Sequence, residues 1–390
     1  MTGNPGPPPI ALVTYSTKPR GGVAHTLALG EALHALGRQV MIVGLGDPEK
    51  GFFRPVAAPT HVVSAPTVGG GLEEKVAANI DALEIALADI APTHPILHTQ
   101  DCISARAAAR VRDAGTTCRV VRTVHHVDDF DSESLMDCQA RAILEPDRIL
   151  VVTTTWQHIL REDYGVHAAV VPNGVDPLRY RQAPPDLVAR LRARVGASDR
   201  PMLLAVGGIE PRKGSDTLVA ALSRLVGRRT PPPVLAVLGG HSFQDHRAYR
   251  ERVLASLGPL GLTLGRDVVE LGTVPEEEMA AWYAAADVLA FPSVKEGFGL
   301  AALEAMAAGV PVVTSDLPVF REWLVPGRDA LLVPVGDADA LADALSRALD
   351  DHALRDRLRT AGLALVDGYT WTASAKRHLE LYAEVPVPTP

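Results

Sequence analysis

Two glutamates, Glu296 and Glu304, stand eight positions apart around a Gly-Phe-Gly turn (residues 297–299). A run of strong helix formers follows the turn, and the unpaired N–H groups at the start of such a helix favour an anion. Glu304, in the second turn of that helix, would repel a phosphate and is better suited to accept hydrogen bonds from ribose hydroxyls. With Glu296 at a reacting sugar, this segment would bind a nucleotide sugar.

The residues before the turn are expected to position it. The apolar run from Asp287 to Ser293 is typical of a buried parallel strand, so the segment should pass from strand through glycine loop to helix. An alternative interpretation gives both acids an ordinary role, in which Glu296 caps the helix and Glu304 lies on its solvated face.

A second loop, Gly207 to Gly214, also follows a predicted strand and opens a predicted helix. It carries two adjacent cations, Arg212 and Lys213, which are suited to clamp a diphosphate. Ligands of parallel sheets bind at the carboxyl ends of strands, where this loop should lie. The alternative is that the pair is simply solvated.

A third loop, Lys18-Pro-Arg-Gly-Gly22, follows the first predicted strand. Gly21 and Gly22 would let the backbone approach a phosphate closely. The spacing is not the G-x-G-x-x-G of dinucleotide-binding folds, and an ordinary tight turn has the same sequence.

A histidine pair, His125 and His126, ends a further predicted strand and precedes three aspartates at positions 128, 129 and 131. Imidazoles and carboxylates bind divalent metals, but consecutive side chains rarely point at one ion, so a metal site is the less favoured interpretation. The histidines are otherwise polar loop residues, and the aspartates are otherwise N-caps of the helix that follows.

Short apolar runs alternate with helical patterns along the chain, which predicts an α/β fold with parallel sheets. A length of 390 residues suggests two domains, with a boundary near residues 173–185, where Pro, Asn and Gly cluster. Strands of the first sheet are predicted at 10–15, 39–45, 95–98, 119–124, 148–153 and 168–171. Strands of the second are predicted at 202–206, 234–238, 268–271, 288–291, 310–314 and 330–333, with late helices at 355–366 and 371–382.

Composition narrows the class of protein. A net charge of −8 and a pI of about 5.9 argue against a nucleic-acid binder. Three cysteines without metal-ligand spacing indicate thiols in a reducing compartment, so a cytoplasmic location is expected. The N-terminus lacks the pattern of a signal peptide and predicts a disordered tail. No apolar stretch is long enough to span a bilayer. Residues 1–180 carry 15 Lys and Arg against 20 Asp and Glu, so docking to anionic lipid is not expected.

The two-glutamate motif follows a D-x4-P-S strand and precedes Ala308 to Val313 (Ala-Gly-Val-Pro-Val-Val). With these motifs the chain resembles the retaining glycosyltransferases of family 4 (group 1). These enzymes have the GT-B fold, two Rossmann-like domains with parallel sheets facing across a cleft. The resemblance covers nearly the whole chain and is densest from Val206 to Pro334. It implies a tail at 1–9, an acceptor-side domain at 10–178, a nucleotide-sugar domain at 179–368, and a terminal helix at 369–390 that crosses back to the first domain.

The resemblance also implies a role for each candidate residue. Four residues would be catalytic. His125 would lie near the transferred sugar together with Glu296, and Arg212 and Lys213 would bind the pyrophosphate. Many members of the family carry Gly-Arg where this chain has Gly207-Gly208. The chain therefore matches the family at the pyrophosphate-binding lysine, Lys213, and departs from its pattern at the arginine, whose role is assigned to Arg212. Donor-binding residues would be Gly21, Gly22, Val274, Gly297, Phe298, Gly299, Leu300 and Glu304.

The reaction implied is transfer of a sugar from a nucleoside-diphosphate sugar to a hydroxyl acceptor, a small molecule or a glycan. The acceptor would attack the front face of the donor, without metal or cofactor, and the departing diphosphate would take its proton. A nucleotide-sugar epimerase or hydrolase of the same fold and a sugar phosphorylase are the alternatives. The base, the sugar, the acceptor and the oligomeric state are left open.

Overall fold

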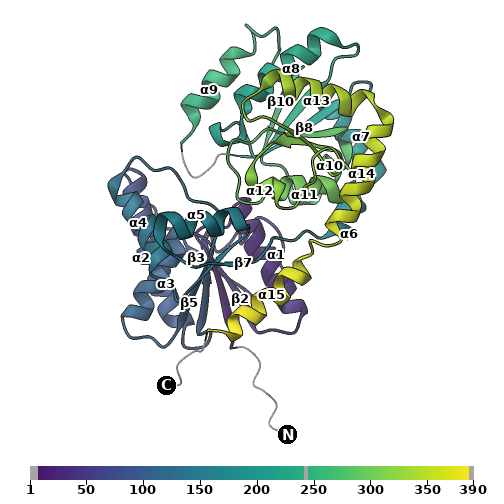
Figure 1. The fold of residues 1–390 in the computed structure, drawn as a ribbon. Helices are drawn as coiled ribbons and strands as arrows, with labels where there is room; N and C mark the ends of the chain where they lie inside the picture. Colours follow the sequence, from purple (N-terminus) through teal and green to yellow (C-terminus); the bar gives the residue numbers. More distant parts are fainter. Residues whose placement is uncertain (1–7, 241–244, 386–390) are drawn as a thin grey trace. The chain divides into compact units, whose positions relative to one another are not determined.

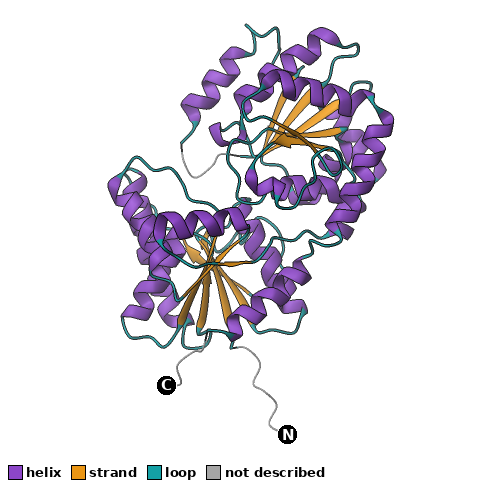
Figure 2. Ribbon diagram, in the orientation of Figure 1, coloured by secondary structure: helices purple, strands orange, loops and turns teal. Residues whose placement is uncertain are grey.

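The computed structural model describes residues 8–240 and 245–385, so most of the expected N-terminal tail lies outside the described residues. The chain forms two compact units. The first runs to Gly174 and takes in the segment that starts at Trp371, and the second spans Val175–Thr370. Figure 2 shows that each unit has a sheet with helices on both of its faces. The predicted α/β fold with two parallel sheets is confirmed.

The first unit has a seven-stranded parallel sheet in the order β3-β2-β1-β4-β5-β6-β7 (Figure 1). Its strands are β1 (Ile10–Thr14), β2 (Val40–Gly46), β3 (Thr60–Ser64), β4 (Ile96–Thr99), β5 (Arg119–Val124), β6 (Arg148–Val151) and β7 (Ala169–Val170). Its helices are α1 (Gly21–Ala35), α2 (Leu72–Ile90), α3 (Cys102–Asp113), α4 (Glu133–Leu144), α5 (Thr154–Tyr164) and α15 (Trp371–Ala383).

The last of these helices completes the core of the first unit. Ala375, Leu381 and Tyr382 of α15 are buried in one cluster with Leu12 of β1 and Leu27 of α1. α15 therefore packs on α1, although more than 330 residues separate them in the sequence.

The second unit has a six-stranded parallel sheet in the order β10-β9-β8-β11-β12-β13. Its strands are β8 (Met202–Val206), β9 (Val234–Leu238), β10 (Val268–Gly272), β11 (Val288–Phe291), β12 (Val312–Ser315) and β13 (Leu331–Val333). Its helices are α6 (Pro177–Arg181), α7 (Pro185–Arg194), α8 (Ser215–Arg228), α9 (Arg247–Ser256), α10 (Met279–Ala285), α11 (Leu300–Ala307), α12 (Pro318–Arg321), α13 (Ala338–Asp350) and α14 (His352–Val366), with short 3₁₀ turns η1 (Pro211–Lys213) and η2 (Glu276–Glu278).

Each sheet reverses its strand order once. In the first unit this occurs between β1 and β4, and in the second between β8 and β11. Loops on either side of such a reversal turn away from each other and leave room at the carboxyl edge, where ligands of open α/β sheets bind. The candidate loops follow β1, β5, β8 and β11, so the fold places them at these edges.

No helix in the described ranges is both long enough and apolar enough to cross a membrane.

Candidate functional site

Two loops of the second unit meet at the carboxyl edge of its sheet. They are residues 207–214, after β8, and residues 292–299, after the neighbouring strand β11. Gly214 has a φ of +63°, and a Cβ added there would lie 2.1 Å from the carbonyl oxygen of Pro292. Only glycine allows this close approach, so the Arg-Lys-Gly sequence positions its cations against the second loop.

The contact between the loops brings three charged side chains together. The Val294 N–H donates to the Arg212 carbonyl at 2.8 Å. The Lys213 Nζ lies 2.7 Å from Glu296 Oε1, and the Arg212 Nη1 lies 3.1 Å from the same oxygen. The side chains of Glu296, Lys213 and Arg212 are 7%, 13% and 34% exposed, so Arg212 is the outermost member.

The two cations hold the carboxylate in its charged form. Burial raises the pKa of Glu296, but attraction to Lys213 and Arg212 outweighs burial and lowers this pKa to about 2. Burial lowers the pKa of Lys213, repulsion by Arg212 adds to this shift, and Glu296 opposes it. At neutral pH the group thus has one buried anion between two cations, and its excess positive charge lies on the solvent side.

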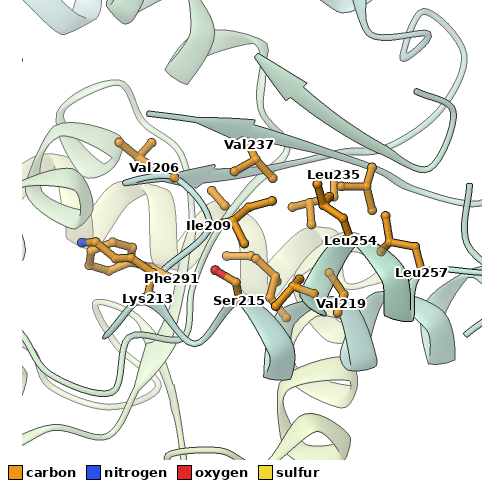
Figure 3. A pocket seen from close by; sticks show the side chains of 16 residues that line it. Val206, Ile209, Lys213, Ser215, Val219, Leu235, Val237, Leu254, Leu257 and Phe291 are labelled. Atoms are coloured by element: carbon orange, nitrogen blue, oxygen red, sulfur yellow. The ribbon is translucent and has the colours of Figure 1, made fainter. Parts of the chain in front are cut away.

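An apolar cavity lies behind Lys213 (Figure 3). Lys213 and Phe291 lie at one end of it and Leu254 and Leu257 at the other, and the Lys213 Nζ sits 4.6 Å from the Phe291 ring centroid. Apolar side chains of β8, β9, α8 and α9 supply half of the lining. Such a lining would leave phosphate oxygens without donors, so the cavity is unsuited to a diphosphate.

The helix after the second loop starts at Leu300, as the glycine turn predicts. Gly299 has a φ of +96°, and a Cβ there would lie 2.3 Å from the Phe320 ring. Phe298 is buried and stacks on Trp323, with ring centroids 5.3 Å apart. The aromatic packing fixes the turn, and Gly299 caps α11 without using a side chain, so the first N–H groups of α11 are left for other acceptors.

Glu304 lies in the second turn of α11 and is half-buried. The Tyr283 hydroxyl donates to Glu304 Oε2 at 2.6 Å, and Tyr180 packs edge-on against Tyr283 with centroids 5.6 Å apart. Burial raises the pKa of Glu304, while hydrogen bonds from Tyr283 and Tyr180 oppose this shift. The two tyrosines lie on α10 and α6 and had no recognisable signal in the sequence, because each reads as an ordinary helical core residue.

In the first unit, the glycine loop and the histidine lie side by side. α1 begins at Gly21, and a Cβ added at Gly22 would lie 3.7 Å from the His125 ring. The His125 Nε2 lies 3.0 Å from Gln100 Oε1, which follows β4. Burial lowers the pKa of His125 to about 3, and neighbouring histidines and Arg122 add to this shift, so the ring is neutral at physiological pH.

Further buried histidines support His125. His25 packs edge-on against His125 with centroids 4.7 Å apart, and its Nδ1 lies 2.8 Å from Asn173 Oδ1. His98 bonds to Tyr382 of α15 at 2.6 Å. Sequence reasoning missed this cluster, because its members come from five separated segments and only the fold assembles them.

The remaining predictions lie as follows. Val274 follows β10 and lies at the same sheet edge as the two charged loops. His126 and Asp128 approach within 3.3 Å, but no cluster of three or more metal-ligating side chains occurs within the described ranges.

Family models match both parts of the chain. Residues 19–179 match the "Glycosyltransferase Family 4" model and residues 189–364 match the "Glycosyl transferases group 1" model. A D-inositol 3-phosphate glycosyltransferase of Nocardia farcinica is 37% identical over 257 residues, which cover 63% of this chain and 54% of the relative. The chain therefore spans about half the length of that relative.

A phosphatidyl-myo-inositol mannosyltransferase of Mycobacterium leprae is 31% identical over 395 residues, which cover 95% of both chains. Among solved structures, a sucrose-phosphate synthase of Thermosynechococcus elongatus superposes with a TM-score of 0.79 at 26% identity and covers 97% of this chain and 99% of that one. The charged loops, the glycine loop and these matches agree, and the chain belongs to the group 1, family 4 glycosyltransferases, enzymes with the GT-B fold.

Proposed function

We propose that the protein is a retaining, metal-independent glycosyltransferase of the cytoplasm that moves a sugar from a nucleoside-diphosphate sugar to a hydroxyl acceptor. The observation that carries the proposal is the grouping of Arg212, Lys213 and Glu296 beside the start of α11. A diphosphate needs cations and N–H donors in one place, and this sheet edge offers both.

In the free enzyme, Glu296 neutralises part of the positive charge of Lys213 and Arg212. When the donor binds, its diphosphate would compete with Glu296 for Lys213 and Arg212, and Glu296 would turn toward a sugar hydroxyl. As the bond from the sugar to the diphosphate breaks, negative charge grows on the leaving group. Cations that are already in place stabilise this charge more than they stabilise the bound donor, which is how they raise the rate.

The nucleoside end is assigned to Glu304. The Tyr283 hydroxyl donates to Oε2, and the ribose hydroxyl is assigned to the remaining acceptor capacity of the carboxylate. The tyrosine hydrogen bonds keep the carboxylate available as an acceptor although burial favours its protonated form.

His125 is assigned to the transferred sugar together with the glycine loop. A neutral imidazole held by Gln100 can exchange hydrogen bonds with hydroxyls but adds no charge. His125 itself is a neutral imidazole bonded to an amide and is no carboxylate nucleophile, and front-face attack by the acceptor is the mechanism we favour.

The relatives suggest which acceptor to test first. Both of those described above are named for inositol-containing acceptors, one soluble and one a lipid. The acidic balance of residues 1–180 supports the soluble member, a phosphorylated inositol.

A thermal-shift screen with UDP, GDP, ADP and TDP identifies the base, because a ligand held at about 100 times its Kd adds about 2.7 kcal/mol to the stability of the folded state. The matching nucleotide sugar is then supplied with and without inositol phosphate, in EDTA. Sugar transfer that persists in EDTA and keeps the anomeric configuration of the donor, read by NMR, supports the proposal. Release of nucleotide that does not depend on acceptor indicates the epimerase or hydrolase alternative, and activity that returns only with Mn²⁺ or Mg²⁺ contradicts metal independence.

A further inference from the structure

Two of the three cysteines lie on neighbouring helices of the first unit. Cys102 is the first residue of α3 and Cys138 lies in α4, and these helices pack side by side. Both thiols are half-buried, so they are within reach of solvent, whereas Cys118 is buried. The chain thus offers one pair of accessible thiols and one isolated, inaccessible thiol as an internal comparison.

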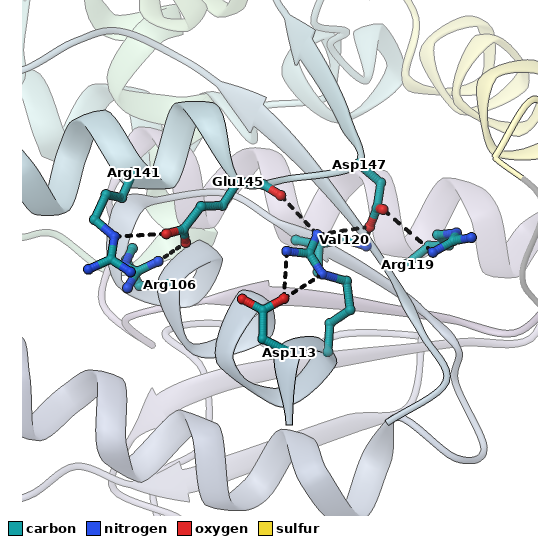
Figure 4. Close-up of polar contacts among 8 residues, drawn as sticks. Arg106, Asp113, Arg119, Val120, Arg141, Glu145 and Asp147 are labelled. Atoms are coloured by element: carbon teal, nitrogen blue, oxygen red, sulfur yellow. Dashed lines mark hydrogen bonds and ion pairs between the residues drawn. The ribbon is translucent and has the colours of Figure 1, made fainter. Parts of the chain in front are cut away.

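A network of ion pairs fixes α3 against α4 one helical turn from these thiols (Figure 4). Arg106, four residues after Cys102, pairs with Glu145 just beyond α4. Arg141, three residues after Cys138, donates to the same carboxylate at 2.8 Å. Residues three or four apart share a helix face, so the thiols and the ion pairs lie in successive layers of one interface.

The thiols also interact with each other and with a buried cation. The Cys102 S–H donates a hydrogen bond to the Cys138 sulfur. Arg122 of β5 is 4% exposed, and its Nε and Nη1 have no hydrogen-bond partner within the described ranges. Its charge attracts both sulfurs. A guanidinium that lacks an acceptor favours a thiolate at the pair.

The charges around the pair decide which sulfur reacts. The hydrogen bond from Cys102, with attraction to Arg106 and Arg122, outweighs burial and lowers the pKa of Cys138 to about 7. The hydrogen bond and burial raise the pKa of Cys102. Cys138 therefore supplies the thiolate and Cys102 the second thiol, while burial raises the pKa of Cys118 to about 11.

We propose that Cys102 and Cys138 are a redox pair that a peroxide converts to a disulfide between α3 and α4. The Cys138 thiolate attacks one peroxide oxygen, the O–O bond breaks, and the other oxygen leaves as water after taking a proton. The resulting sulfenic acid is attacked by the sulfur of Cys102, whose proton goes to the departing oxygen as a second water. Two thiols are oxidised by one peroxide, and an external thiol reductant reverses the step.

The test uses the full chain, reduced and then treated with hydrogen peroxide. Trypsin separates the three cysteines, because Arg106, Arg112, Arg119 and Arg122 lie between them. We expect a cross-linked peptide that contains Cys102 and Cys138, together with a loss of the mass of two hydrogen atoms, and its disappearance on addition of dithiothreitol. Oxidation of Cys138 to sulfinic acid while Cys102 remains a free thiol would overturn the proposal.

Alkylation by iodoacetamide tests the pairing without any oxidant. In the parent the rate at Cys138 should rise with pH around a midpoint near 7. Cys102→Ala removes the hydrogen-bond donor and should slow alkylation at pH 7 about tenfold, because the thiolate fraction falls toward that of an ordinary cysteine. Cys118→Ser is the matched control and should behave like the parent in both assays. If Cys102→Ala folds poorly, Cys102→Val serves instead because it also lacks a donor, and an unchanged rate at Cys138 in a folded variant contradicts the pairing.

Discussion

The carboxyl edges of the two sheets use the same strand reversal but carry different side chains. In the second unit, Arg212, Lys213 and Glu296 form a charged group in which the pKa of the carboxyl is far below its ordinary value. In the first, Gly22 and His125 form an uncharged surface in which burial lowers the pKa of the imidazole. The same framework therefore offers charge compensation on one unit and neutral hydrogen bonds on the other, as a diphosphate and a set of sugar hydroxyls respectively require.

The largest expected effect is on the charged edge. Lys213→Ala should lower kcat/KM by roughly 10²–10³, because it removes a charged donor whose interaction strengthens as the leaving group departs. Steady-state kinetics with saturating acceptor measures this loss. Arg228→Ala, a change of an exposed cation on the same unit, should leave kcat/KM within about twofold of the parent, since exposed ion pairs contribute little. If the Lys213 variant is as active as the Arg228 variant, the charge of Lys213 does not contribute to catalysis, and the proposed contrast between the two sheet edges is wrong.

The two glutamates should separate by ligand. Glu304→Ala should weaken binding of the bare nucleoside diphosphate by about 10–150-fold, the range expected for loss of a hydrogen bond to a charged group. Glu296→Ala should lower turnover without weakening that affinity, because Glu296 is assigned to the sugar and only competes with the diphosphate for Lys213 and Arg212. Calorimetric titration of both variants measures the difference. Equal and unchanged affinities with normal turnover would support the view that both acids are merely structural, and loss of nucleotide affinity in Glu296→Ala alone would reverse the assignment.

Acid should destabilise the histidine-rich unit first. His378 of α15 is fully buried, and burial lowers its pKa from 6.5 to about 4. The unfolded chain binds this proton at higher pH than the folded chain does, so stability present above pH 6.5 is lost as pH falls toward 4, by about 2 kcal/mol at pH 5. The pKa of Glu296 is also lowered, to about 2, so its contribution persists until pH falls below about 4.5.

Hydrogen exchange measured by mass spectrometry shows which unit loses stability first as the pH falls. Between pH 8 and pH 5, peptides from α15 should lose protection while peptides from β11 and α13 keep it. His378→Leu, which cannot be protonated, should reduce the difference between the two pH values. Simultaneous loss of protection in both units would contradict the contrast between a neutral and a charged edge.

The smallest expected effect concerns Tyr283, which hydrogen-bonds to Glu304, the residue assigned to the ribose. Tyr283→Phe removes the 2.6 Å hydrogen bond to Glu304, and we expect nucleotide affinity to fall about fivefold, equivalent to about 1 kcal/mol. Tyr249→Phe is the matched control, because the Tyr249 hydroxyl accepts from the Asp216 backbone away from this carboxylate. If both variants bind nucleotide as the parent does, Tyr283 has no part in positioning Glu304.

Much of the fold follows from local sequence pattern. Buried strands such as β8, β9 and β11 are continuous apolar runs, so they were predictable to within a residue or two. β3 was missed because it is an edge strand with a largely exposed surface, and its Thr-His-Val-Val-Ser sequence has no apolar run long enough to predict a strand. Edge strands form hydrogen bonds with a neighbour on one side only, and the sequence signal that predicts them is weak.

The site was predictable only in part. Lys213 and Glu296 were singled out by their loops, but their ion pair joins residues 83 positions apart and depends on β8 and β11 being neighbours. Tyr283 and Gln100 escaped notice because their roles arise from contacts that the fold creates rather than from any motif. Sequence pattern thus predicts which loops carry the chemistry, while the protonation states and the supporting hydrogen bonds require the structure.

The path of α15 has a consequence for how the protein is made. Ala375, Leu381 and Tyr382 complete a core begun by Leu12 and Leu27, yet the ribosome reaches them only after the whole second unit has been synthesised. The earlier domain of a growing chain usually folds first, but here the nascent first unit keeps an open apolar face until the second has emerged. Chaperone binding during translation should therefore persist past residue 174 and end once residues 371–385 leave the exit tunnel.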